Sequence, residues 1–273
     1  MDRKLEEVEF VIFDTETTGL DPRSGDRIVE IAALRFKDQE RLGQFHSLVN
    51  PCREISPRAF EVNQISQDML KDAPRMNDVL PRFLGFIQDS CLCAYNLPFD
   101  LSFLNNELKL AGFDPLVNFA LVDILAMSRK LLPKLERHAL WFVAQDLGLE
   151  NKQVHRAFAD VELTWKVFER LKVMLQEKGI SKFNNFLNLF SVSAGLLNSA
   201  NEKNLVKIEE AIELGLKLRI KYFSRSTAAV SEREVMPKEI KFEQKQAYLV
   251  AFCLLRNEER TFRVDNVLDL EII

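Results

Sequence analysis

The stretch EFVIFDTETTGL, residues 9–20, joins an apolar run to two acids and a turn. Residues 9–13 are apolar and rich in β-forming residues, which predicts a short buried strand. Asp14 and Glu16 follow, and side chains two positions apart on an extended chain point the same way. Because converging carboxylates repel unless a cation lies between them, the pair is a candidate metal site. A solvated pair of acids at a loop edge is the simpler alternative.

The flanking sequence predicts an α/β domain. Residues 28–36 and 45–49 also have strand character, which with the first run predicts an antiparallel meander, and residues 92–95 predict a further short strand. Helical patterns begin at residue 67 and recur over 101–111, 140–147 and 160–177. Strands followed by alternating helices favour a mixed sheet covered by helices.

Two later segments add further acids and a histidine. AYNLPFDLSFL, residues 94–104, places Asp100 at the start of a predicted helix, where a helix N-cap is the alternative role. HRAFAD, residues 155–160, places His155 and Asp160 around another helix start. A lone histidine is more often a packed or surface residue than a base, and Asp160 alone could be an N-cap. Together, however, hard carboxylate ligands suit Mg²⁺ or Mn²⁺, and a neutral imidazole suits proton abstraction from water.

In this order, FDTETTGL, AYNLPFDLSFL and HRAFAD resemble the three motifs of the DEDDh (DnaQ-like) 3′→5′ exonucleases, a superfamily that includes the proofreading subunit of bacterial replicative polymerase. The resemblance covers residues 8–175. It implies an RNase H-like fold, two Mg²⁺ or Mn²⁺ ions, and release of mononucleotides from single-stranded 3′ ends. It further implies that His155 is the general base and that Thr17 and Leu20 contact the terminal nucleotide, while Asn96 and Phe103 line the strand path. The implied metal ligands are Asp14, Glu16, Asp100 and Asp160.

The C-terminal third has a different texture. Residues 178–204 are rich in Asn and Ser and predict a connector that is helical in part. Residues 205–216 suit an amphipathic helix, and β-like runs at 217–223, 247–255 and 261–264 predict a small barrel or sandwich. We therefore expect an exonuclease domain over residues 1–177, a connector over 178–204 and a second domain over 205–273.

This second domain resembles the WYL domain, a small Sm-like β-barrel associated with binding nucleic acids or nucleotide ligands. The segments that carry the resemblance are 233–237, 247–252 and 260–265, although Ala247 replaces the Trp of the family's name and Asn266 replaces a usual basic residue. Lys217 and Arg219 alternate with apolar residues, so they form either a basic strand face or an ordinary solvated one. The expected contacts are Lys217, Arg219, Arg233, Tyr248, Arg256, Arg260 and Arg263.

Composition limits the remaining possibilities. A net charge of -4 argues against a general polyanion-coating protein, and four unpatterned cysteines argue against a zinc site. With no signal peptide and no apolar run of about 20 residues, we expect a cytoplasmic protein without a membrane partner.

Single-stranded DNA is the favoured partner, with RNA the alternative, and roles in DNA repair, proofreading and RNA processing stay open. No polymerase or helicase motif is visible, so a protein partner stays unknown. The competing hypothesis is a non-catalytic nucleic-acid-binding or regulatory protein.

Overall fold

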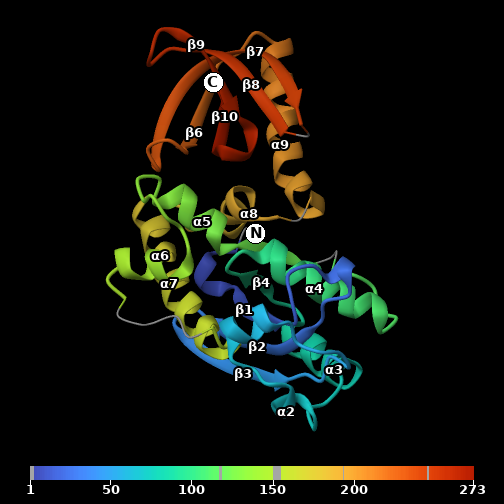
Figure 1. The fold of residues 1–273 in the computed structure, drawn as a ribbon. Coiled ribbons are helices and arrows are strands. Elements are labelled where there is room, and N and C mark those ends of the chain that lie inside the picture. The colour runs from blue at the N-terminus through green and yellow to red at the C-terminus, as the bar shows by residue number, and fades with distance from the viewer. Residues whose placement is uncertain (1–2, 117–118, 150–154, 193, 245) are drawn as a thin grey trace.

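The computed structural model describes residues 3–116, 119–149, 155–192, 194–244 and 246–273, with the backbone alone for 194–202. Figure 1 shows an α/β body that contains the N-terminal part of the chain, through α8, and an antiparallel sheet built from its C-terminal part. Helices α5 and α8 lie between the two bodies. In the described part of the chain, no helix is both long and apolar enough to cross a bilayer.

The first sheet is mixed, as predicted. Its strands are β1 (Glu9–Thr17), β2 (Ile28–Lys37), β3 (Glu40–Leu48), β4 (Cys91–Ala94) and β5 (Ala120–Asp123), in the order β3-β2-β1-β4-β5. β1, β2 and β3 pair antiparallel, which confirms the meander, whereas β4 and β5 run parallel to β1. The central strand β1 therefore ends in the middle of the sheet edge, with Asp14 and Glu16 near that end.

Helices cover both faces of this sheet, which explains the uninterrupted apolar run in β1. Phe10 and Ile12 face one cluster with α7, while Val11 and Phe13 face another with α3 and α4. The helices are α1 (Pro57–Asn63), α2 (Gln67–Leu70), α3 (Met76–Ile87), α4 (Leu97–Leu110), α5 (Ile124–Leu131), α6 (Leu140–Asp146), α7 (Ala157–Glu177), α8 (Phe183–Phe190) and α9 (Ala194–Glu213).

Helix α8 lies within the segment expected as a connector, but it packs into the core of the α/β body. The ring of Phe186 is fully buried, 5.9 Å from the ring of Phe10 and 6.1 Å from that of Phe168, both edge-on. Residues 180–190 therefore contribute side chains to the core of the first body. The frequent Asn and Ser residues favoured a connector, although Phe183, Phe186, Leu187 and Phe190 form an apolar face with helical spacing.

The second sheet is antiparallel throughout. Its strands are β6 (Leu218–Ser224), β7 (Ala229–Glu243), β8 (Gln246–Cys253), β9 (Glu258–Arg263) and β10 (Val267–Ile272), in the order β10-β6-β7-β8-β9. Ile208 and Ala211 of α9 pack on its core. Among the described residues β9 and β10 do not pair, so closure into an Sm-like barrel stays a prediction. Phe223 and Leu268 join the core that contains α7 and α8, so the two bodies pack together.

Candidate active site

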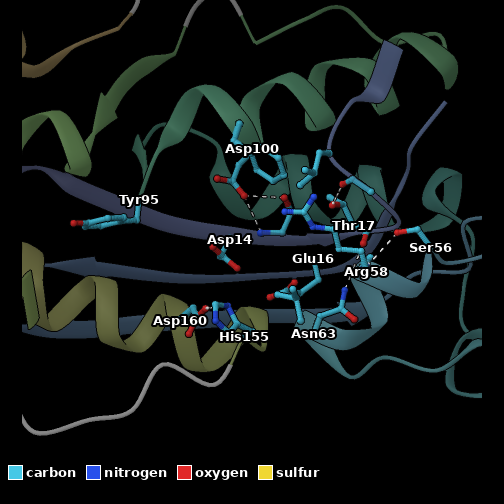
Figure 2. A pocket seen from close by; sticks show the side chains of 16 residues that line it. Asp14, Glu16, Thr17, Ser56, Arg58, Asn63, Tyr95, Asp100, His155 and Asp160 are labelled. Atoms are coloured by element: carbon cyan, nitrogen blue, oxygen red, sulfur yellow. Dashed lines mark hydrogen bonds and ion pairs between the residues drawn. The ribbon is translucent and has the colours of Figure 1, made fainter. Parts of the chain in front are cut away.

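Three of the predicted acids meet at the end of β1. Carboxylate oxygens of Asp14, Glu16 and Asp160 all lie within 4.8 Å of one another. Asp14 and Glu16 are half-buried on β1, and Asp160 is buried in the first turn of α7. Figure 2 shows these side chains converging from the strand and the helix on one space. The convergence expected from their spacing on an extended strand is therefore present.

Asp100 lies beside this cluster but is held separately. It is buried in the first turn of α4. Its Oδ1 accepts hydrogen bonds from the backbone N–H of Thr15 at 3.0 Å and from the Thr15 hydroxyl at 2.7 Å. These bonds fix α4 to β1 and bring Asp100 to the same hollow as the other acids.

The electrostatics of the site favour a cation. Burial, and then the carboxylate of Asp100, raise the pKa of Asp14 well above its usual range. Burial and the neighbouring acid Asp160 raise the pKa of Glu16 to about 8, and burial raises the pKa of Asp100 to about 7. Crowded carboxylates in a partly dry site repel, and a divalent cation relieves that repulsion. Because the donors are all hard oxygens, the residues fit Mg²⁺ or Mn²⁺.

His155 stands at the edge of the cluster. Its Nδ1 lies 4.0 Å from Oδ2 of Asp160, and half of the side chain is exposed. Its backbone is left-handed, with φ of 51°, immediately before α7 begins at Ala157. The imidazole is therefore close enough to the acids to exchange a proton with a water molecule held between them.

Two hollows meet at the acids. The smaller, about 330 Å³, lies between the end of β1, α1 and the loop that contains Leu20, whose side chain is 68% exposed. Thr17 is buried there, and its hydroxyl donates to the carbonyl of Gly19 at 2.5 Å. A Cβ on Gly19 would meet the carboxylate of Asp26, which would have to move.

The larger hollow, about 660 Å³, lies on the other side of Asp14. Asn96 lines it, together with Arg129 and His138. Tyr95 also lines it, and its hydroxyl donates to the carbonyl of His138 at 2.6 Å. Both hollows share Asp14, Tyr95 and His155, so an extended ligand could pass from one to the other across the acid cluster.

One prediction for this region is wrong. Phe103 is fully buried in the core, where its ring packs 5.1 Å from that of Phe99, so it does not line the strand path. The neighbouring Phe99 lines the smaller hollow instead, because it lies one turn earlier on α4. Arg58 and Asn63 of α1 also line that hollow. They carried no sequence signal, since α1 lies outside all three motifs in the sequence.

The second body has a basic hollow of its own, of about 310 Å³. Arg233, Arg260 and Arg263 line it, as does Arg225, which no sequence motif marked. Burial and then the charge of Arg263 lower the pKa of Arg225. Asp265 pairs with both of these arginines and offsets part of their mutual repulsion. The other expected contacts, Lys217, Arg219, Tyr248 and Arg256, are not among the residues that line this hollow.

Comparison with curated proteins matches about two thirds of the chain to longer polymerases. DNA polymerase III PolC-type of Thermotoga petrophila is 39% identical over 189 residues, which are 69% of this chain but 14% of that protein. The same protein of Staphylococcus haemolyticus is 36% identical over 180 residues, 66% of this chain and 12% of that protein. The chain thus spans a small fraction of the length of these relatives.

Solved structures share the fold. Exonuclease X in complex with 5′ overhanging duplex DNA superposes with a TM-score of 0.50 and 25% identity, over 62% of this chain and 93% of that one. The zinc-bound E. coli exonuclease I complex with single-stranded DNA gives a TM-score of 0.59 over 90% of this chain and 55% of that one, with 17% identity. Family models match residues 11–168 as an exonuclease and 203–272 as a WYL domain. This chain therefore belongs to the DnaQ-like exonuclease family and carries a C-terminal WYL domain.

Proposed function

We propose that the protein is a 3′→5′ exonuclease that releases nucleoside monophosphates from single-stranded nucleic acid, with DNA favoured over RNA. The observation that carries this proposal is the meeting of Asp14, Glu16 and Asp160 within 4.8 Å, beside His155, at the junction of two hollows. An exonuclease needs space for one nucleotide on one side of the scissile bond and for a continuing strand on the other. The smaller and larger hollows provide these two spaces.

Each residue then has a distinct role. Asp14, Glu16, Asp100 and Asp160 would hold two divalent ions, which when bound stabilise charge on the attacking and leaving oxygens. His155 takes the proton from the attacking water, for which it stands beside the acids rather than among them. Thr17 and Leu20 contact the terminal nucleotide in the smaller hollow. Asn96 lines the larger hollow, through which the rest of the nucleic-acid strand passes.

The structural neighbours support a nucleic-acid substrate, since exonuclease X and exonuclease I were both solved with DNA. We propose in addition that the WYL domain binds nucleic acid or a nucleotide through the hollow that contains Arg225, Arg233, Arg260 and Arg263. Guanidinium groups recognise phosphate with two parallel hydrogen bonds and stack on bases, which suits either ligand.

The test is digestion of single strands of DNA and of RNA, each labelled at the 5′ end, with Mg²⁺ or Mn²⁺. A 3′→5′ exonuclease gives a ladder of labelled strands that shortens with time and unlabelled mononucleotides as products. Chelation of the metal should stop the reaction. If labelled mononucleotide appears first, the polarity is opposite. If neither strand is shortened while both are bound, the protein is a non-catalytic binding protein.

A further inference from the structure

Another buried acid lies next to the cluster without belonging to it. Glu30 on β2 is the direct cross-strand partner of Glu16 on β1, and it is only 1% exposed. Among the described acids, the group close enough together to hold a metal ion is Asp14, Glu16 and Asp160, and Glu30 is not part of it. A buried carboxylate is costly unless hydrogen bonds or a cation satisfy it, so its partners indicate its purpose.

Glu30 is satisfied entirely by protein groups. Arg156 donates from Nη2 to Oε1 at 2.8 Å and from Nε to Oε2 at 3.1 Å, a two-point ion pair. The backbone N–H of Ala157 donates to Oε2 at 3.0 Å. Nε2 of His46, on β3, lies 2.7 Å from Oε1. Both carboxylate oxygens are therefore engaged twice, and three of these four interactions come from one short segment of the chain.

That segment holds two parts of the proposed active site. Arg156 directly follows His155, and Ala157 is the first residue of α7, whose first turn contains Asp160. His155 also has a left-handed backbone, φ 51°, which is uncommon for residues other than glycine and carries a conformational cost that neighbouring contacts must offset. The ion pair between Arg156 and Glu30, one residue further along the chain, can hold His155 in this conformation.

We propose that Glu30 is a positioning residue, which holds His155 and the start of α7 against the acids of β1 by clamping Arg156 and the N–H of Ala157. This inference rests on the proposed function, in which His155 is the base. Glu30 touches neither substrate nor metal in this scheme and acts through Arg156. Since misplacing a reacting group by about 1 Å can lower a rate by about 10²-fold, loosening the clamp should lower kcat and leave substrate binding intact.

The chain contains a matched control for this ion pair. Glu107 on α4 is 2% exposed, accepts from Nε and Nη2 of Arg27 at 2.7 and 2.6 Å, and accepts from the N–H of Ile28 at 3.3 Å. This pair has the same chemistry and a similar burial but connects other elements. Arg27→Ala therefore reproduces the loss of a buried two-point ion pair without releasing the segment around His155.

The kinetic experiment compares full-length Arg156→Ala and Arg27→Ala on a single-stranded DNA substrate with Mn²⁺. Arg156→Ala should lower kcat by about 10²-fold with KM changed by no more than about twofold. Guanidinium ion added to that variant should restore part of kcat, because it can refill the site beside Glu30. Arg27→Ala should show neither the specific kcat loss nor the rescue. Equal kcat losses in the two variants, or no rescue, would overturn the proposal.

A second measurement does not depend on cleavage. The chain has three histidines, His46, His138 and His155, so their ring signals can be assigned one by one in a protein with ¹³C-labelled histidine. In Arg156→Lys, which keeps the charge but loses the two-point geometry, the signals of His155 and His46 should move while that of His138 stays. A His155 signal that does not move would overturn the clamp. A shifted signal in a protein that cleaves no nucleic acid would instead reject the proposed function alone.

Discussion

Glu16 and Glu30 face each other across β1 and β2, yet their pKa values are shifted in opposite directions. Burial and the carboxylate of Asp160 raise the pKa of Glu16 to about 8. Burial also disfavours the charge on Glu30, but hydrogen bonds from Arg156, His46 and Ala157 outweigh it and lower the pKa. One strand pair thus presents a carboxylate that neighbouring acids crowd, Glu16, and a carboxylate whose charge the protein itself neutralises, Glu30.

The first prediction follows from the raised pKa values of the cluster. A carboxyl that binds its proton more tightly in the folded protein stabilises the fold at low pH and loses that stabilisation as pH rises. For Glu16 this window runs from its ordinary pKa of 4.5 to about 8. Without metal, the melting temperature should therefore fall between about pH 5 and about pH 8. Saturating Mg²⁺ should flatten this dependence, and an equal fall with metal present would contradict it.

The second prediction concerns the acids themselves. Asp14→Asn or Asp160→Asn should abolish cleavage, because each removes a ligand from the cluster. Both should leave the metal-free protein at least as stable as the parent at neutral pH, since each substitution relieves repulsion between carboxylates. Single-strand digestion and thermal melting with chelator measure the two effects. A severe drop in melting temperature would mean that these acids support the fold instead.

The third prediction separates the base from the metal ligands. His155→Ala should lower kcat by about 10² to 10⁴-fold, the range typical for the loss of a general base. Its affinity for Mn²⁺, measured by electron paramagnetic resonance, should stay close to that of the parent, because the imidazole lies outside the acid cluster. An unchanged rate would assign His155 to packing, and a large fall in Mn²⁺ affinity would make it a ligand.

Sequence predicted those parts of the site that depend on local geometry. The two-residue spacing of Asp14 and Glu16 on an apolar strand was enough to expect that they converge, and the structure confirms it. The mixed sheet could be predicted because apolar residues recur with one spacing in strands and another in helices, and the sequence shows strand-like runs followed by alternating helical patterns. Those parts of the site whose geometry depends on one short segment could therefore be predicted from the sequence alone.

Other parts depend on contacts between distant segments and gave no local signal. Glu30 meets Arg156 across 126 positions, and in the sequence it is one acid within an apolar strand. Phe103 and Phe99 carry the same side chain on the same helix, so only the packing of α4 decides which of them reaches the hollow. The role of α8 was hidden for a similar reason, because Phe10, the partner of Phe186, lies far from it in the sequence, near the N-terminus.

The fourth prediction tests the path of the strand. Arg129 lines the larger hollow beside the acids, where it could contact a phosphate of the continuing strand. Arg129→Ala should raise KM for a long single strand by about tenfold, the effect of one charge-assisted hydrogen bond. Hydrolysis of the p-nitrophenyl ester of thymidine 5′-monophosphate, which has no such strand, should be unchanged. Arg137→Ala is the control, because Arg137 lies over the ring of Phe142 and outside this hollow.

The last prediction concerns the WYL domain. If Arg233 and Arg260 contact phosphates in the basic hollow, then Arg233→Ala with Arg260→Ala should weaken binding of long single strands. The salt dependence should also become shallower, by about 0.7 in the slope of log affinity against log salt for each phosphate that is no longer neutralised.

Lys238→Ala is the control, because it removes a charge from the same domain. Lys238 pairs with Glu259 and does not line the hollow, so the salt dependence of this variant should match that of the parent. Cleavage of dinucleotides should be the same in all variants, because the acid cluster lies in the other body. Unchanged slopes in the double variant would mean that the basic hollow serves a free nucleotide or a protein partner rather than the strand.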